Sequence, residues 1–381
     1  MEELLALRPA RARIDLDRLA ANYAAVAAYA GLPLLPVVKA DAYGHGAVAV
    51  SRALVKAGAT RLAVAYPEEG VELRGAGVDV PVIVLAGFAS GQVGLMARHR
   101  LTPIVSTPTH LASLLASPDR PPTAHVKVDT GMSRLGFADD AFVEASLRLS
   151  DAHVEVEGVL THLASADESA DVNTRQLDRF DAAVAALGRR GLRPSVVHVA
   201  SSAGLSTRRP GHTLVRPGLL LYGLKTRPLS PDVAVRPVMT VSADISLVKE
   251  VLEGTPVSYG GHGVAARPSR IATVPLGYAD GVPRTRAMSD AGAFAVGGRR
   301  SPVAGRVCMD LTMLDVTDDG SVREGDEAVL FGDEPTAWDV AAWAGTTAWQ
   351  VLTAIGPRVP RVYVEGGRIV EVNSRYPVPG S

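Results

Sequence analysis

Cysteine and lysine are scarce in this sequence of 381 residues. The one cysteine, Cys308, excludes a disulfide within the chain and suits a reducing compartment. The net charge of -1 includes no basic block, which argues against a nucleic-acid partner. The chain shows neither a signal-peptide core nor an apolar run long enough to span a membrane, so we expect a cytoplasmic protein without membrane partners. Because lysine is rare, the place of each is informative; the five are Lys39, Lys56, Lys127, Lys225 and Lys249.

The first part of the chain alternates short apolar runs with helical segments. Eight runs have the length and composition of buried strands, and they span residues 34–39, 61–66, 80–86, 101–106, 124–130, 156–163, 195–201 and 213–223. Eight parallel strands with crossover helices in about 220 residues match a closed (β/α)8 barrel of the TIM type. The runner-up is an open doubly wound sheet, but the chain lacks the glycine fingerprint and the phosphate loop that would support it.

The pattern changes near Pro237. Short alternating runs follow, separated by pairs of glycine, proline and aspartate, which is typical of a small β domain. One stretch, residues 336–356, reads as helical instead. We therefore predict an α/β protein with an N-terminal (β/α)8 barrel over residues 11–236. A C-terminal, mostly-β domain is predicted over residues 237–381, joined by residues 1–10.

Lys39 ends the first apolar run, LLPVVK, and a loop of small residues, ADAYGHG, follows at once. In a (β/α)8 barrel the active site lies at the carboxyl ends of the strands. Burial there lowers the pKa of an amine and makes it a candidate to form an imine with a carbonyl compound. The same reasoning places six further residues on this rim: Tyr43, Arg134, His162, Ser201, Ser202 and Arg216.

This set of groups suits pyridoxal phosphate, whose aldehyde Lys39 would hold. Arg216 would meet the pyridine nitrogen, and an always-charged donor there leaves that nitrogen unprotonated, which favours proton exchange over transamination. No spacing of histidines or carboxylates indicates a metal site. Hydroxyl and backbone N–H groups would hold the phosphate, and these come from Tyr43, Ser202, Gly218 and Leu219.

The segment VVKADAYGHG resembles the cofactor-lysine signature of alanine racemases. Other segments resemble that family's blocks in the family's order: VDTGMSRLGF, THLAS, HVASSAG, VRPGLLLYG, VSYG, PLGYADG and GRVCMD. The resemblance covers nearly the whole chain and implies a fold-type III pyridoxal-phosphate enzyme. It also implies interconversion of L- and D-alanine for peptidoglycan, by a homodimer in which the β domain of one subunit completes the barrel mouth of the other.

The resemblance assigns two bases. It makes Lys39 the cofactor lysine and the base on the D-alanine face, and Tyr259 the base on the L-alanine face. Racemisation needs such a pair, because a proton lost to one base is regained from the other. A phenol has an ordinary pKa near 10, so it needs assistance. A hydrogen-bonded string from Arg216 through His162 to Tyr259 would favour the phenolate.

Other matched positions surround the substrate. Arg134 lies near the substrate carboxylate in the family, and the backbone N–H of Met309 binds it. Tyr278 resembles the tyrosine of the access channel, with Asp310 as its polar neighbour. Lys127 matches a position that is carbamylated in some members and then orients Arg134.

Two departures from the family's pattern concern the cofactor. Ser201 stands where the family often has asparagine, and Pro357 stands where some members place a tyrosine on the phosphate. Phosphate binding here is therefore expected to depend more on Tyr43, Ser202 and backbone N–H groups.

Three rival functions share parts of this pattern. A racemase of broader or different specificity, for instance for serine or a basic amino acid, would keep the whole scaffold and differ in pocket volume. A fold-type III decarboxylase would replace Arg216 with an acidic residue. A non-catalytic cofactor-binding barrel would lack Tyr259 and the second domain. The sequence therefore favours an enzyme of the alanine racemase type, an isomerase.

Overall fold

The structure, a computed structural model, describes residues 8–226 and 231–375. They form two compact units. The barrel unit consists of Leu19–Ala42 and Ala47–Val235. The β-rich unit consists of the described residues up to Arg18, Tyr43–Gly46 and those from Arg236 onward. None of the described helices has the length and apolar character needed to cross a bilayer.

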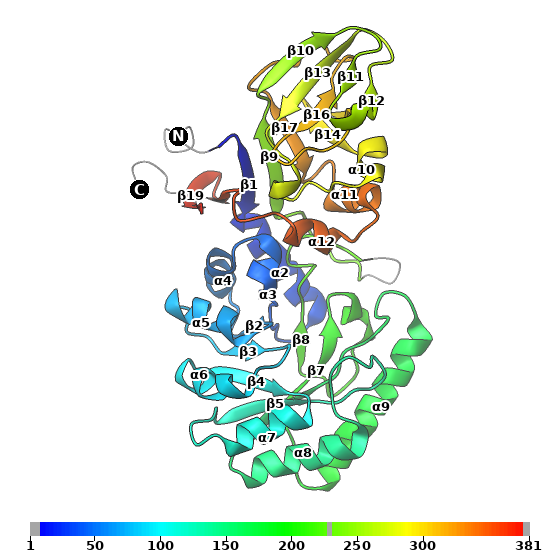
Figure 1. The fold of residues 1–381 in the computed structure, drawn as a ribbon. Coiled ribbons are helices and arrows are strands. Elements are labelled where there is room, and N and C mark those ends of the chain that lie inside the picture. Colours follow the sequence, from blue (N-terminus) through cyan, green and yellow to red (C-terminus); the bar gives the residue numbers. More distant parts are fainter. Residues whose placement is uncertain (1–7, 227–230, 376–381) are drawn as a thin grey trace. The chain divides into compact units, whose positions relative to one another are not determined.

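Seven parallel strands form the sheet of the barrel unit and follow one another in chain order (Figure 1). Their residues are almost all buried, as expected for parallel strands that are covered on both faces. The strands are β2 (Leu62–Val64), β3 (Val82–Val84), β4 (Leu101–Val105), β5 (Thr123–Lys127), β6 (Glu155–Leu160), β7 (Val196–Ser201) and β8 (Leu214–Arg216).

The segment that carries Lys39 closes this sheet. Leu34 pairs in parallel with β8, and Val37 pairs in parallel with β2. Pro36 has no N–H group to donate, which helps to reduce this eighth strand to single bridges. The prediction of a (β/α)8 barrel is therefore confirmed, with its first strand less regular than the sequence suggested.

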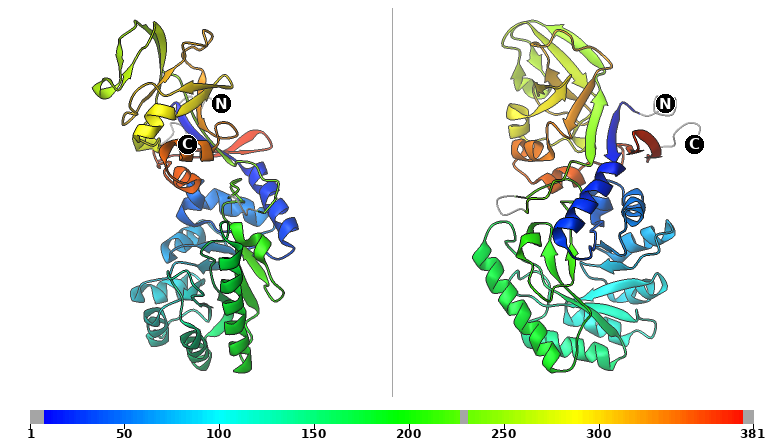
Figure 2. Two further views of the ribbon diagram at one scale, coloured as in Figure 1. Left: turned by 90° about the vertical axis from the view of Figure 1, so that its right-hand side faces the viewer. Right: turned by 180° about the vertical axis from the view of Figure 1, so that it is seen from behind.

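Helices cover the outside of the barrel strands (Figure 1), and Figure 2 shows the longest of them, α9, running along the sheet. Each turns its apolar residues inward; Phe142 of α8 and Phe180 of α9 are fully buried. The short helix α6 was not predicted, because six residues are too few to show a helical period. The helices are α2 (Leu16–Ala30), α4 (Ala47–Lys56), α5 (Pro67–Gly75), α6 (Val93–Arg98), α7 (Pro108–Ala116), α8 (Asp139–Asp151) and α9 (Ala170–Arg189).

The last predicted strand, residues 213–223, is shorter than expected. Strand β8 ends at Arg216, and the apolar residues that follow form turns. The hydroxyl of Ser202 accepts hydrogen bonds from the N–H groups of Gly218 at 2.9 Å and Leu220 at 3.2 Å. These bonds take the place of a strand partner, so the chain curls around Ser202.

The β-rich unit contains a seven-stranded sheet in the order β15-β14-β17-β9-β1-β18-β19, a three-stranded sheet β10-β13-β16 and the pair β11-β12. Its mostly-β character agrees with the prediction. The strands are β1 (Ala10–Asp15), β9 (Met239–Asp244), β10 (Leu247–Val251), β11 (Pro256–Val257), β12 (Gly263–Val264), β13 (Ser269–Val274), β14 (Ala293–Val296), β15 (Arg299–Pro302), β16 (Thr312–Asp315), β17 (Glu327–Phe331), β18 (Arg361–Glu365) and β19 (Arg368–Asn373).

The N-terminal strand β1 lies inside this C-terminal sheet, antiparallel to β9 and parallel to β18. Its residues Ala10, Ala12 and Ile14 are fully buried. The predicted domain limits, 11–236 and 237–381, stay a prediction, but the strand shows that residues beyond 10 belong to the β-rich sheet. The stretch read as helical forms α11 (Ala337–Ala344) and α12 (Ala348–Thr353).

Candidate active site

Lys39 begins the short helix α3 (Lys39–Gly44), directly after the strand that closes the barrel. The four residues from Ala40 to Tyr43 have φ angles between 52° and 54°, so this turn is left-handed. Such a backbone costs roughly 1–2 kcal/mol per L-residue. Strain of this kind persists only where surrounding contacts impose it, and it is concentrated at functional sites.

Two carboxylates impose the left-handed turn. Glu69 of α5 accepts hydrogen bonds from the N–H of Ala40 at 2.7 Å and of Ala65 at 2.6 Å. Asp41 accepts from the N–H of Ala47 at 2.7 Å. Sequence analysis did not single out Glu69, although a glutamate at the third position of a helix that starts with proline is a typical capping residue.

The Lys39 amine is set up as a nucleophile. Burial and the positive charge of Arg134 lower its pKa, against an opposing effect of Glu69. The amine has no hydrogen bond or ion pair with any residue that the structure describes. A lowered pKa increases the neutral fraction of the Lys39 amine, and only the neutral amine can attack a carbonyl carbon.

Arg216 is buried in the barrel and contacts only neutral groups among the described residues. Its Nη2 lies 3.1 Å from His162 Nδ1 and donates to the carbonyls of Thr161 and Val199, while Nη1 donates to the carbonyl of His198 at 2.8 Å. Burial and Arg134 lower its pKa to about 10, which leaves it charged at neutral pH. The structure therefore brings together the predicted pair Arg216 and His162.

His162 is neutral in this setting. Burial, followed by the charges of Arg216 and Lys127, holds its pKa well below the ordinary value. The side chain of Gln176, on α9, fixes the backbone around it by donating to the His162 carbonyl at 3.2 Å and accepting from Ala164 N–H at 2.8 Å. No sequence signal distinguished this glutamine from other polar residues of a helix.

Positive charge is in excess at the barrel mouth. Burial, Arg134 and Arg216 lower the pKa of Lys127 to about 8, although Asp129 opposes the change. The nearby carboxylate of Asp129 accepts hydrogen bonds from the backbone N–H groups of Gly131, Met132 and Ser133. Four cationic groups therefore act on one another and make this mouth a site for anions: Lys39, Lys127, Arg134 and Arg216.

Hydrogen-bond donors for an anion lie after β7 and β8. Because the Ser202 oxygen accepts two N–H groups, its own proton remains to be donated. The N–H of Gly218 is one of these two and is thus engaged inside the protein. The N–H of Leu219 has no acceptor among the described residues. Burial raises the pKa of Tyr43, which belongs to the β-rich unit, to about 12, so its phenol remains a donor.

These groups fit a phosphorylated aldehyde. The barrel unit offers an amine of lowered pKa, an excess of cations, the O–H of Ser202 and the N–H of Leu219. Among the described residues, histidine, cysteine and carboxylate side chains form no group of three or more that could hold a metal ion. The donor set thus agrees with the predicted cofactor, pyridoxal phosphate.

In the β-rich unit, Tyr259 begins the short helix η3 (Tyr259–Gly261), and 66% of its surface is exposed. Tyr259 lines a cavity of about 430 Å³ together with Cys308 and Leu311. Met309, between these two, is also exposed, and its N–H has no acceptor among the described residues. The structure thus brings Tyr259 close to the loop that carries Met309, and it divides the predicted bases Lys39 and Tyr259 between the two units.

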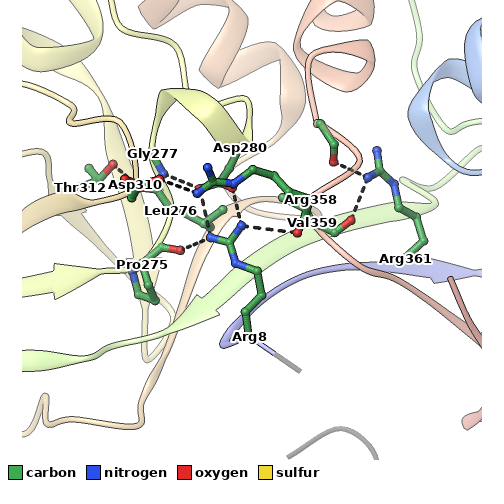
Figure 3. Close-up of polar contacts among 11 residues, drawn as sticks. Arg8, Pro275, Leu276, Gly277, Asp280, Asp310, Thr312, Arg358, Val359 and Arg361 are labelled. Carbon is green, nitrogen blue, oxygen red and sulfur yellow. Dashed lines mark hydrogen bonds and ion pairs between the residues drawn. The ribbon is translucent and has the colours of Figure 1, made fainter. Parts of the chain in front are cut away.

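Asp280 ties the Tyr278 turn to the rest of the β-rich unit (Figure 3). This carboxylate is fully buried, and it accepts from the N–H of Gly277 at 3.0 Å and from the guanidinium groups of Arg8 at 2.5 Å and Arg358 at 2.7 Å. Arg358 also binds Asp310 at 2.6 Å. The predicted neighbours Tyr278 and Asp310 are therefore held by one ionic cluster.

Gly277 permits the Tyr278 turn to lie against the Met309 loop. A Cβ atom at Gly277 would stand 2.3 Å from the Met309 carbonyl oxygen, so only glycine fits there. The N–H of Tyr278 donates to Cys308 O and that of Ala279 to Met309 O, both at 3.0 Å. The N–H of Met309 is thereby held in a fixed place.

We expect Asp280→Asn to destabilise the protein by about 2 kcal/mol, because the buried carboxylate that binds two partly exposed guanidinium groups becomes a neutral amide. Asparagine has the same shape as aspartate, so the loss of stability comes from the removed charge and not from a change in volume. Urea unfolding followed by circular dichroism measures it. The KM for substrate is expected to rise, since the Met309 loop loses its anchor.

The matched control is Asp290→Asn, which removes an exposed ion pair between Asp290 and Arg286. Its effect should stay near zero, because exposed pairs contribute at most about 0.5 kcal/mol in this helical spacing. Equal unfolding midpoints for the two variants would show that Asp280 does not anchor the turn.

The fold and the barrel mouth fit one class of protein, the (β/α)8 barrel enzymes that hold a phosphorylated carbonyl cofactor on a lysine. Comparison with known proteins narrows the class. Residues 14–226 match the family described as "Alanine racemase, N-terminal domain", and residues 238–363 match "Alanine racemase, C-terminal domain". The chain belongs to the alanine racemase family, whose members are isomerases that depend on pyridoxal phosphate.

Individual relatives agree along nearly their whole length. Alanine racemase of Halothermothrix orenii is 42% identical over 93% of this chain and 97% of its own. The structure of alanine racemase from Streptomyces coelicolor A3(2) has a TM-score of 0.87 and 40% identity, covering 95% of this chain and 99% of that one. Alanine racemase from Bacillus anthracis with bound L-Ala-P has a TM-score of 0.88 and 31% identity, covering 96% and 97%.

Proposed function

We propose that this protein interconverts L-alanine and D-alanine with pyridoxal phosphate as its cofactor. The observation that carries the proposal is the pairing of a desolvated Lys39 amine with a buried, charged Arg216 at one barrel mouth. An arginine rather than a carboxylate near the cofactor ring favours proton exchange over other reactions. The family relationship supports alanine as the substrate.

Different groups would hold the aldehyde, the ring nitrogen and the phosphate of the cofactor. Lys39 would bind its aldehyde carbon, and Arg216 would face its ring nitrogen. Ser202, Tyr43 and the N–H of Leu219 would donate hydrogen bonds to its phosphate. When bound, the cofactor makes the α-proton of an amino acid acidic by withdrawing electrons from the α-carbon.

Two residues of the protein would move the proton. Lys39 would take or return it on the D-alanine face, and Tyr259 on the L-alanine face. His162, kept neutral beside Arg216, would accept the Arg216 N–H at Nδ1 and so present an N–H at Nε2 to Tyr259. That donor would stabilise the phenolate that serves as the second base.

The substrate carboxylate would be held by the free N–H of Met309, with Arg134 nearby. Lys127 would support Arg134, and a carbamate on Lys127 would replace a repulsion between two cations with an attraction. Lys39 and Met309 belong to different units. The family relationship supports a homodimer in which the β-rich unit of one subunit would complete the barrel mouth of the other. The enzyme would act in the cytoplasm and supply D-alanine for peptidoglycan.

The test is to incubate the purified protein and pyridoxal phosphate with L-alanine in deuterated water. We expect D-alanine that carries deuterium at its α-carbon. Deuterium uptake without D-alanine would mean that only one base serves alanine. If neither signal appears with alanine but both appear with serine, the racemase has a different substrate.

A further inference from the structure

A chain of hydrogen bonds extends from Arg216 through the interior of the barrel to Glu157. Arg216 Nη1 lies 3.1 Å from His198 Nδ1, and His198 Nε2 lies 2.9 Å from His125 Nδ1. His125 Nε2 lies 3.2 Å from Glu157 Oε2, and Arg61 pairs with the other Glu157 oxygen. Apart from Arg61, which directly precedes β2, these residues come from the adjacent strands β5 to β8. None of them except Arg216 has a part in the proposed function.

Both histidines of this chain are neutral. Neither has any exposed surface. Burial and the charge of Arg216 hold the pKa of His198 well below the ordinary value, and burial also lowers that of His125 although Glu157 opposes it. A neutral imidazole has one nitrogen that donates and one that accepts. Each ring can therefore pass a hydrogen bond in one direction only.

The arginine sets that direction. A guanidinium only donates, so His198 Nδ1 must accept, and the His198 proton must be on Nε2. That proton is donated to His125 Nδ1, which places the His125 proton on Nε2, facing Glu157. Every contact in the chain is satisfied by this arrangement and by no other with neutral rings, and Glu157 is the acceptor that ends it.

Space for the chain is built into the neighbouring strand. A Cβ atom on Gly158 would stand 2.5 Å from His125 Nδ1, so the imidazole lies directly against the glycine backbone. Gly158 is paired with His125 across β5 and β6 at a point where the register shifts. The dipeptide Glu157–Gly158 thus supplies both the acceptor for His125 and the room for its ring.

We infer that Glu157 and His125 are positioning residues for Arg216. By accepting the His125 proton, Glu157 fixes the tautomers of His125 and His198, so that His198 presents an unprotonated Nδ1 to the guanidinium. Without that acceptor, His125 forms a better hydrogen bond when its proton is on Nδ1 and is donated to His198 Nε2. The His198 proton is then on Nδ1, and the Arg216 guanidinium faces an N–H donor instead of an acceptor. The inference rests on the proposed function, in which Arg216 meets the ring nitrogen of the cofactor.

Three variants test the inference. Glu157→Leu removes the acceptor, Glu157→Gln keeps an amide oxygen that can accept, and Glu155→Gln changes an exposed glutamate on the same strand as a control. We expect Glu157→Leu to lower kcat about 10- to 100-fold, as loss of an orienting partner does elsewhere, with KM within about twofold. Glu157→Gln should recover most of kcat, and only Glu157→Leu should shift the visible absorption maximum of the bound cofactor.

Equal losses in Glu157→Gln and Glu157→Leu would show that charge, not proton direction, is what Glu157 provides. Wild-type kcat in all three variants would mean that the ion pair is only structural. Either result overturns the inference, whereas an inactive wild type would refute the proposed function instead.

A second measurement needs neither a variant nor activity. Neutron diffraction from crystals of the wild-type holoenzyme in deuterated water locates the deuterons on the two rings. We expect deuterium on Nε2 of both His125 and His198 and none on either Nδ1. Deuterium on Nδ1 of either ring would overturn the assignment even if Glu157→Leu fails to fold.

Discussion

Replacing Lys39 with alanine is expected to lower the racemisation rate by at least about 10⁴-fold, because the cofactor loses its covalent attachment and the reaction loses one of its two bases. The visible absorption band of the lysine-bound cofactor should disappear as well. A coupled assay for D-alanine and an absorption spectrum measure the two effects. Lys56→Ala, which changes an exposed lysine of α4, serves as the control and should match the wild type.

The structure supplies the alternative that this experiment must exclude. Lys127 is also buried at the barrel mouth, and its pKa is lowered to about 8. If Lys39→Ala kept a visible band that borohydride could fix on the protein, the cofactor would be attached elsewhere. Lys127 would then be the first candidate, and peptide mapping of the reduced protein would identify it.

The position of Lys39 was predictable, whereas the conformation around it was not. An apolar run that ends on lysine and is followed by small residues indicates a strand end at a barrel mouth. Nothing in the letters ADAY indicates φ angles above 50°, since none of these residues prefers the left-handed region as glycine does. The turn depends on Glu69, which lies 29 residues from Ala40. A local pattern carries no information on a partner at that distance.

The N-terminal strand was missed for a related reason. The sequence ARARID alternates small or apolar residues with polar ones, which is a strand pattern of period two. Its partners β9 and β18 lie more than 200 residues along the chain, as the pairing of Ala12 with Val241 and Arg361 shows. The sequence analysis therefore predicted that N-terminal residues join the β domain, but it ended this N-terminal segment at residue 10, whereas β1 runs from Ala10 to Asp15.

The polar chain next to Arg216 shows what strand order adds. The sequence analysis gave His125 and His198 no role, because the histidines show no metal-ligand spacing. The order β5-β6-β7-β8 places them beside each other, and only then does Glu157 become their acceptor. The one usable signal was the glycine after Glu157, which leaves space in a strand that is otherwise filled with side chains.

Replacing Tyr259 with phenylalanine is expected to slow α-proton removal from L-alanine by about 10²- to 10³-fold and to leave removal from D-alanine nearly unchanged. The phenol hydroxyl is the group that the L-alanine face loses, while Lys39 still serves the other face. Racemisation rates cannot reveal this difference, because the two enantiomers have equal free energies and kcat/KM must fall equally in both directions. The measurement is therefore loss of α-deuterium from each labelled enantiomer in ordinary water.

Tyr29→Phe, on α2, is the control for that experiment, because it removes a tyrosine hydroxyl outside the candidate site. It should leave both exchange rates at the wild-type value. Equal slowing of the two enantiomers in Tyr259→Phe would contradict the two-base scheme and would point to a role for the phenol in binding.

The same variants decide whether the site is shared between subunits. If Lys39 and Tyr259 act together across a dimer, a hybrid of one Lys39→Ala and one Tyr259→Phe subunit has one site with both changes and one intact site. Random exchange of equal amounts makes half of the dimers hybrid, so about one quarter of the wild-type activity should return. If each site were built within one chain, every site in the mixture would carry a change and no activity would return. Recovery of activity would therefore establish that the exposed Tyr259 faces the barrel of a partner, which neither variant can show by itself.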